Sequence, residues 1–229
     1  MCGRFTLRTP ATDLAEIFAV DARPNLAARY NIAPSQDILV VRAGSGPSPA
    51  REFAMPRWGL VPHWAKDPAI GSRMINARAE SLAEKPSFRD AYRRRRCLVA
   101  ADGFYEWRKA PDGGKQPYHI RLADDAPFAI AGLWESWRAA DGETLETCAL
   151  ITTEANRAVA PIHHRMPVIL PPAAYQYWLD PQSSPDALGE LLRPYADDDL
   201  VALAVASRVN SARHDDAACL EAAVGELLL

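Results

Sequence analysis

The chain has 229 residues, of which 48 % are hydrophobic and 24 % charged, and its formal net charge is -3. This composition is ordinary for a folded globular protein and excludes a largely disordered chain. No run approaches the roughly 20 apolar residues that a membrane span needs, and Arg4 and Arg8 interrupt any signal-peptide core, so we expect a cytoplasmic protein without membrane contact.

The first residues predict a short strand and then a helix. Residues 4–7 have a strand pattern, and Thr9-Pro10 predicts a helix start in which a capping residue precedes a proline. Residues 30–34 are expected to form a loop. The apolar residues that follow the helix start at helical spacing are Leu14, Ile17 and Phe18.

Two strand-like runs flank a turn in the next part of the chain. Residues 38–42 are rich in β-branched side chains, and residues 53–60 are expected to be the returning strand. Residues 44–49 contain the glycine, serine and proline typical of a turn. Residues 62–64 predict an exposed turn with an aromatic side chain at its tip.

The rest of the chain is predicted to be mostly strand. Short helical patterns first cover residues 79–85 and 87–94, and residues 112–114 and 141–142 fit hairpin turns. A helix started by proline is expected at residues 171–179. The expected strands are residues 97–101, 104–108, 118–122, 128–137, 147–153, 166–170 and 201–206.

These elements predict one α+β domain. Neither an internal repeat nor a convincing linker divides the chain. We therefore expect mostly antiparallel β-sheets that form a barrel-like core with peripheral short helices. The domain is expected to cover residues 1–220, and residues 221–229 a short C-terminal tail.

The spacing of the cysteines does not predict a disulfide-bonded fold. Neither a disulfide scaffold nor a zinc site is expected, because the cysteines lie far apart and none forms a Cys-x-x-Cys pair. We expect reduced thiols, no metal and no other cofactor. The four residues are Cys2, Cys97, Cys148 and Cys219.

Charge is distributed unevenly along the chain. Residues 1–121 contain 20 Lys and Arg against 12 Asp and Glu, whereas the remainder contains 6 against 17. An anionic ligand would therefore prefer surfaces built by the first half. The alternative is that the two halves interleave in space and their charges cancel.

Cys2 offers the most distinctive chemistry. Because it follows the initiator and has a small side chain, Met1 is expected to be removed, which leaves an α-amine beside the thiol. The amine titrates near ~8 and the thiol near ~8.5, so a modest local shift would activate either nucleophile. The alternative is an incidental cysteine at a frayed chain end.

Glu106 lies among aromatic residues on an expected strand. If its carboxyl group is buried there, loss of hydration would raise its pKa and make it a general acid near neutral pH. The alternative is an exposed glutamate whose aromatic neighbours face the core.

A loop bracketed by prolines carries His163, His164 and Arg165. A histidine can shuttle a proton, and an arginine can bind a phosphate through two parallel hydrogen bonds. Adjacent histidines point apart in most backbones, and no carboxylate or cysteine lies at ligand spacing, so no shared metal is expected. The alternative is an ordinary surface turn.

Two further stretches contain polar groups suited to binding. Asn76 could hold a nucleophilic amine by accepting its hydrogen bond, and Arg78 could pair with an anion; a helix cap beside a surface charge is the alternative. Residues 93–96 are all arginine, but a solvated helix end that enters a buried strand is the commoner cause of such a run. The nucleophile elbow, the P-loop and the dinucleotide-binding glycine motif are absent.

Eight short segments occur in order along residues 1–219: MCGRF, YNIAPSQ, RWGLVPHW, INARAES, AEKPSFRDA, CLVAADGFYEW, HHRMPVIL and AVASRVN. Each is modest alone, but together they resemble the SOS response-associated peptidase family. Members of that family are also described as abasic-site processing proteins.

The resemblance implies a covalent reaction with damaged DNA. Cys2, exposed by loss of Met1, would attack the open-chain aldehyde of an abasic deoxyribose in single-stranded DNA and form a stable thiazolidine crosslink. Asn76 would orient the Cys2 amine, and Glu106 would act as general acid and base. His163 would assist opening of the sugar ring, although the neighbouring histidine leaves open which of the two faces the site.

The resemblance also implies a DNA-binding surface. Arg78 and Arg165 match the family's phosphate contacts. The partner would be single-stranded DNA containing abasic sites, bound by a monomer that associates with the nucleoid through that DNA. Further DNA-facing positions implied by the motifs are Gly3, Arg4, Pro34, Trp64 and Thr152.

Two other functions stay open at this point. An N-terminal-nucleophile or cysteine peptidase would use His163 as base and would not depend on DNA. A non-covalent module for single-stranded DNA would bind in a salt-sensitive way, with Cys2 incidental.

Overall fold

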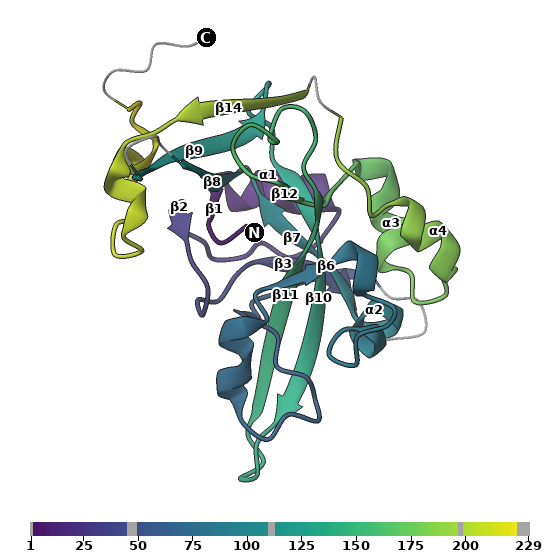
Figure 1. Ribbon diagram of the computed structural model, residues 1–229. Coiled ribbons are helices and arrows are strands. Elements are labelled where there is room, and N and C mark those ends of the chain that lie inside the picture. Colours follow the sequence, from purple (N-terminus) through teal and green to yellow (C-terminus); the bar gives the residue numbers. More distant parts are fainter. Residues whose placement is uncertain (1, 45–49, 110–112, 197–198, 224–229) are drawn as a thin grey trace.

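The computed structural model describes residues 2–44, 50–109, 113–196 and 199–223. Its strands form two open sheets that share one hydrophobic core (Figure 1). Phe5 and Phe104 from one sheet and Leu98 and Leu150 from the other are completely buried in that core. No helix within the described residues is long and apolar enough to cross a membrane.

The first sheet brings the amino terminus into the middle of the molecule. Its strand order is β14-β9-β8-β1-β2, and all neighbouring strands in it are antiparallel. Because β1 lies between β8 and β2, the residues just before it enter the protein interior. The strands are β1 (Phe5–Leu7), β2 (Arg29–Ile32), β8 (Gly103–Lys109), β9 (Lys115–Leu122) and β14 (Leu200–Ala204).

The second sheet is built around a long hairpin. Its main order is β12-β11-β10-β7-β3-β4, while β13 pairs with β10, and β5 and β6 run parallel to β11. The strands are β3 (Val40–Ala43), β4 (Arg51–Ala54), β5 (Arg57–Trp58), β6 (Asn76–Arg78), β7 (Arg96–Ala101), β10 (Phe128–Arg138), β11 (Thr144–Glu154), β12 (Arg165–Pro167) and β13 (Ile169–Leu170).

Burial along β10 explains the shape of this hairpin. Residues 128–133 are all buried, whereas residues 134–138 alternate between more and less buried positions. The strand is therefore covered on both faces near the core and on one face where the hairpin projects (Figure 1). Gly132 lies in the covered part, where an added Cβ would come within 2.9 Å of the Cys97 Sγ atom.

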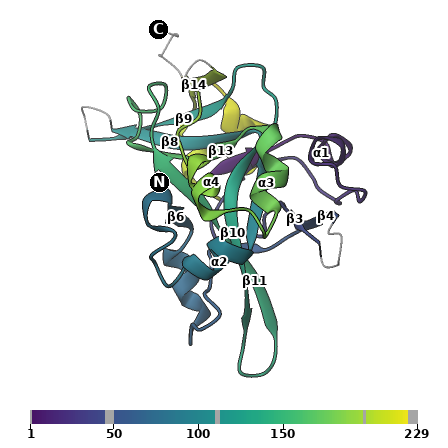
Figure 2. The same ribbon diagram turned by 90° about the vertical axis from the view of Figure 1, so that its right-hand side faces the viewer.

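Short helices lie at the periphery, as expected. In Figure 2, α3 lies over the sheet that contains β10, and Trp178 Nε1 of this helix donates a hydrogen bond of 2.9 Å to the Cys97 carbonyl of β7. The α-helices are α1 (Ala11–Phe18), α2 (Arg89–Arg94), α3 (Tyr175–Leu179) and α4 (Pro185–Glu190). The 3-10 helices are η1 (Pro68–Arg73), η2 (Ala79–Ser81), η3 (Pro172–Ala174), η5 (Ser207–Asn210) and η6 (Ala217–Leu220).

The predicted fold class is confirmed: the protein is a mostly antiparallel α+β domain with short outer helices. Neither sheet closes on itself among the described residues, so the core is barrel-like only in being enclosed by two sheets. The expected turn at residues 44–49 and tail at residues 221–229 lie partly outside the described residues, as does residue 112.

Several element predictions were wrong in detail. The strand expected at residues 53–60 is interrupted at Pro56, which has no N–H for a ladder hydrogen bond, and forms β4 and β5. The helix expected at residues 79–85 is only the short η2. Part of the loop expected at residues 30–34 belongs to β2, and α4 was not predicted.

The predicted helix cap was also wrong. Pro10, not Thr9, is the residue that precedes α1, and no side chain caps this helix. The Thr9 hydroxyl instead donates to the Asp102 carboxylate at 3.2 Å, so tertiary contact replaces the local cap.

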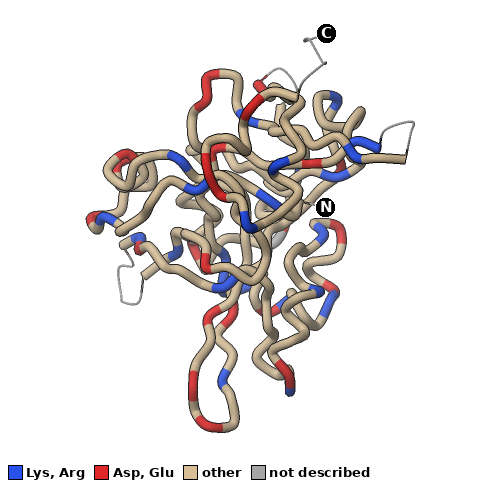
Figure 3. Tube along the Cα trace, turned by 90° about the vertical axis from the view of Figure 1, so that its left-hand side faces the viewer, with Lys and Arg blue, Asp and Glu red and all other residues tan. Residues whose placement is uncertain are grey.

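The two oppositely charged halves of the sequence interleave in space. β9 and β7 from the first half pair with β14 and β10 from the second, and β5 and β6 pair with β11 from the second half. Figure 3 accordingly shows basic and acidic segments mixed over the same side of the molecule. The charge excess along the chain therefore does not produce one basic and one acidic half.

Candidate active site

Cys2 lies three residues before the start of β1, where the first sheet meets the second. Its side chain is completely buried, and its Sγ atom is 3.7 Å from the Arg4 carbonyl oxygen. Burial and the nearby negative charge of Glu106 raise the pKa of the Cys2 thiol well above its usual range. This shift is opposite in direction to the one that would activate the thiol.

Asn76 connects Cys2 to the second sheet. The residue opens β6, which runs parallel to β11, and its Nδ2 atom donates a 2.7 Å hydrogen bond to the Cys2 carbonyl. Asn76 was expected to accept from the amine of Cys2, but here it holds the carbonyl. Its Oδ1 atom is buried and has no hydrogen-bond partner among the described residues, which leaves an acceptor beside the Cys2 main chain.

Glu106 is the buried carboxyl group that the sequence predicted. It lies on β8 opposite Tyr118 of β9 and is only 3 % exposed. Burial raises its pKa to about 7, against the opposing effect of the positive amino terminus. Near neutral pH both the acid and the carboxylate are therefore populated, as general acid and base catalysis requires. The alternative of an exposed strand glutamate is excluded.

His163, rather than His164, faces Glu106. Its Nδ1 atom lies 3.9 Å from Glu106 Oε1, and the Arg165 backbone N–H donates to the same nitrogen at 3.0 Å. Burial lowers the pKa of His163, so its ring is neutral at neutral pH and can accept a proton. His164 is exposed.

The two histidine rings do not point apart as predicted. Their centroids are 4.4 Å apart and the ring planes are tilted by 31°. Even so, no group of three or more potential metal-ligating side chains occurs among the described residues.

Arg78, Thr152 and Arg165 meet where three strands run side by side. Arg78 of β6 is paired with Thr152 of β11, and β12 begins at Arg165 on the other side of β11. Arg78 is exposed. Thr152 is completely buried, so its hydroxyl does not face DNA as predicted, and its carbonyl instead accepts a 2.6 Å hydrogen bond from Arg165 Nη2.

The remaining predicted DNA-facing residues do not all adjoin the amino terminus, because Trp64 precedes Ala65, whose carbonyl accepts a hydrogen bond from Trp137 near the projecting end of β10. Gly3 and Pro34 are half-buried, and Trp64 is 50 % exposed. Arg4 is partly committed to the fold, because its Nη1 atom donates to Asn31 Oδ1 at 2.9 Å and to a backbone carbonyl at 2.8 Å. Contact of these four residues with DNA stays a prediction.

Asp102 is a site-supporting residue to which the sequence analysis assigned no role. It is 1 % exposed and accepts hydrogen bonds from the Thr6 hydroxyl at 2.6 Å, from the Thr9 N–H at 3.0 Å and from Arg8. These contacts anchor the segment that follows Cys2 to the start of β8. The one signal in the sequence was an aspartate inside an otherwise apolar strand region.

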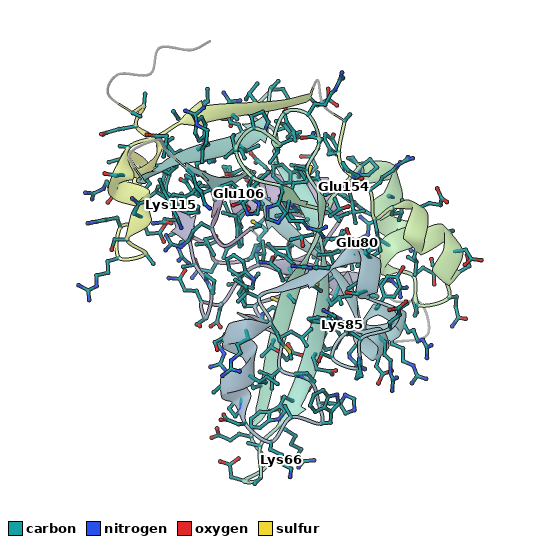
Figure 4. The ribbon with its side chains drawn as sticks, in the orientation of Figure 1. Lys66, Glu80, Lys85, Glu106, Lys115 and Glu154 are labelled. Atoms are coloured by element: carbon teal, nitrogen blue, oxygen red, sulfur yellow. The ribbon has the colours of Figure 1, made fainter. Side chains whose placement is uncertain are left out.

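Figure 4 shows Glu106 near the centre of the molecule, with Glu80 and Glu154 lying toward α3 and α4. Glu80 was not singled out from the sequence either. It forms a two-pronged ion pair with Arg165, at 2.6 Å to Nη1 and 3.0 Å to Nη2.

Fold and site together define a class of protein: an α+β domain that holds a buried cysteine, the second residue of the chain, near a glutamate, a histidine and an asparagine drawn from two sheets. Comparison with known proteins gives the family. The chain belongs to the SOS response associated peptidase (SRAP) family, whose model matches residues 1–212.

Characterised relatives cover nearly the whole chain. It is 45 % identical to the abasic site processing protein YoaM of Bacillus subtilis, over 97 % of this chain and 98 % of the relative. It is 30 % identical to the abasic site processing protein YedK of Escherichia coli, over 83 % of this chain and 85 % of the relative.

Solved structures support the same fold. A crystal structure of a Bacteroides thetaiotaomicron protein superposes with a TM-score of 0.87 at 26 % identity, covering 97 % of this chain and all of that one. A Bordetella bronchiseptica protein has a TM-score of 0.77 at 31 % identity, covering 90 % of this chain and all of that one.

Proposed function

We propose that this protein processes abasic sites in single-stranded DNA by forming a covalent thiazolidine between Cys2 and the opened sugar. The relatives named for abasic-site processing support the substrate, and the chemistry of the four clustered side chains supports the reaction. Removal of Met1 is required, because the reaction needs a free α-amine on the same residue as the thiol.

The reaction balances without an oxidant or a reductant. The Cys2 amine adds to C1′ of the aldehyde, and loss of one water molecule gives an iminium ion. The thiol sulfur then bonds to the same carbon and releases its proton, which closes a five-membered ring. An imine alone would hydrolyse, and ring closure protects it, since a well-aligned intramolecular nucleophile has an effective molarity of order 10⁵ M or more.

The side chains around Cys2 have distinct proposed roles, which are to transfer a proton or to orient the amine. Glu106, with a pKa of about 7, donates a proton to the departing hydroxyl group and, as a carboxylate, accepts the proton of the thiol. Neutral His163 takes the proton of the C1′ hydroxyl of the closed sugar and returns it to the ring oxygen. Asn76 accepts a hydrogen bond from the amine through its Oδ1 atom.

One observation carries the proposal: Asn76 fixes the main chain of Cys2 at 2.7 Å while keeping a buried, unused acceptor beside it. This arrangement orients an amino-terminal residue that would otherwise fray. Arg78 and Arg165 would bind phosphates, and Trp64 would stack on a base, which is worth about 1 to 3 kcal/mol.

The experiment is a crosslinking assay. Protein whose mass shows loss of Met1 is incubated with an oligonucleotide containing one abasic site and analysed on a denaturing gel. We expect a shifted band that resists denaturation, that Cys2→Ala abolishes, and that an extra residue retained before Cys2 also abolishes. No shifted band with intact, methionine-free protein would contradict the proposal.

The same samples distinguish the two alternatives. A peptidase would cleave peptides without any need for DNA, and Cys2→Ala would abolish that cleavage. A non-covalent binding module would retain salt-sensitive DNA binding in Cys2→Ala and give no stable adduct.

A further inference from the structure

Arg165, the residue suited to bind a phosphate, is already occupied in this structure. Its side chain is 11 % exposed, and its two terminal nitrogens donate to the two carboxylate oxygens of Glu80 at 2.6 and 3.0 Å. Nη2 also donates to the Thr152 carbonyl at 2.6 Å. The planar fork that would bind two phosphate oxygens is therefore filled by a carboxylate.

Of the two side chains in the ion pair, Glu80 is the one that can move away. Its side chain is 55 % exposed, whereas that of Arg165 is only 11 % exposed and donates to the Thr152 carbonyl of β11. Glu80 belongs to the short η2 helix directly after β6, the strand that carries Asn76 and Arg78. Rotation of its side chain would uncover the Arg165 fork without moving either strand.

The surroundings favour return of Glu80 to Arg165. Glu80 lines a groove of about 750 Å³ whose lining holds four other carboxylates and one cation, Arg193, so a displaced Glu80 side chain would enter a region of net negative charge. The other acidic residues that line the groove are Glu84, Glu154, Asp186 and Glu190.

We propose that Glu80 is a built-in competitor for the DNA phosphate at Arg165, which a strand must displace in order to bind. The inference rests on the proposed function, since it takes Arg165 as a phosphate contact. Its consequence is weak non-covalent binding, because part of the phosphate's interaction energy is used to displace a carboxylate. Retention on DNA then depends on the covalent step at Cys2.

The test compares Glu80→Gln with Glu84→Gln. Both changes remove one negative charge from the same groove, but the Glu84 carboxylate makes no ion pair within the part of the chain that the structure describes. The probe is a single-stranded oligonucleotide with a tetrahydrofuran abasic analogue, which has no aldehyde and cannot crosslink. Dissociation constants are measured at fixed salt, and thermal melting confirms that each variant is folded.

We expect Glu80→Gln to tighten binding about tenfold, because loss of a charge-assisted competitor exceeds a general charge effect. Glu84→Gln should tighten binding about twofold or less. The DNA concentration that half-saturates adduct formation should fall in parallel in Glu80→Gln. If Glu80→Gln does not fold, Glu80→Asp, whose carboxylate is one methylene shorter, should tighten binding in the same direction.

Equal binding by the two glutamine variants would overturn the inference, and so would weaker binding by Glu80→Gln, which would make Glu80 a support for Arg165. Absence of any DNA binding by the parent protein would also overturn it. Failure of the proposed function is seen separately, as the absence of a crosslink with a true abasic site while these binding constants are still measurable.

Discussion

At the scale of single residues, the site holds two groups in protonation states that suit opposite tasks. The Cys2 thiol is kept neutral by burial and by the charge of Glu106, whereas burial brings Glu106 itself to a pKa of about 7. The carboxylate that discourages ionisation of the thiol is also the nearby base that can take its proton. The proposed reaction therefore depends on Cys2 and Glu106 together rather than on a reactive cysteine alone.

The buried Glu106 carboxyl group should lower the stability of the folded protein above neutral pH. Its pKa rises from 4.5 to about 7 on folding, so the folded state binds the proton more tightly and loses stability as pH rises through this range. We expect Glu106→Gln to be more stable than the parent by roughly 3 kcal/mol at pH 8 and to lose this advantage near pH 4. Chemical denaturation at the two pH values measures the difference.

The same variant should lose activity. Without an ionisable group at this position, adduct formation should slow by about 10²- to 10⁴-fold, with DNA affinity nearly unchanged. An equal loss of affinity and rate would assign Glu106 a structural role instead.

At the scale of elements, β1 matters because Cys2 lies only three residues before its first residue, Phe5. Its far end is tied to the start of β8 by Asp102, which accepts from Thr6, Arg8 and Thr9. This buried carboxylate has an exposed counterpart, Asp125, which is 49 % exposed and pairs with the same arginine at 2.8 Å.

The contrast between these aspartates is testable. Asp102→Asn replaces an acceptor of several hydrogen bonds by an amide whose NH₂ group faces donors, and should destabilise the protein by about 2 to 4 kcal/mol. Asp125→Asn, at an exposed ion pair, should cost less than about 1 kcal/mol. Thermal and denaturant unfolding of both variants provide the comparison, and similar losses would contradict the anchoring role of Asp102.

At the scale of the whole molecule, the site exists only where the two sheets meet. Cys2 and Glu106 come with the first sheet and Asn76 comes with the second, while His163 lies two residues before β12 of the second sheet. The hydrogen bond from Asn76 to the Cys2 carbonyl joins the two sheets at the residue proposed to react. Alignment of the amine therefore depends on the packing of the entire domain.

Variants of two β6 residues should distinguish the alignment of the Cys2 amine from the binding of DNA. Asn76→Ala should slow adduct formation at saturating DNA by about 10- to 100-fold with little change in affinity, because the Cys2 amine loses its fixed orientation. Arg78→Gln should instead weaken binding and lower the salt dependence by about one phosphate contact. Crosslinking rates over a series of DNA and salt concentrations distinguish the two effects. The opposite pattern would exchange the two proposed roles.

Much of the fold and part of the candidate site could be predicted from local sequence pattern. The strand that carries Glu106 and its burial among aromatic residues follow from side-chain type, because apolar strands are covered in a folded core. Element boundaries were less predictable. Thr9 has the composition of a helix cap but bonds to Asp102, since a buried carboxylate 93 residues away offers a better partner.

The sequence by itself determined which groups are present: an aminothiol at Cys2 once Met1 is lost, a carboxyl group within an apolar strand, and motifs in the order of one family. Only the tertiary structure decided which groups meet. It brought His163 rather than His164 to Glu106, turned Asn76 toward the Cys2 carbonyl and placed Glu80 on Arg165. These contacts join residues far apart in the chain, and their distances and protonation states arise from packing between two sheets, which no local pattern encodes.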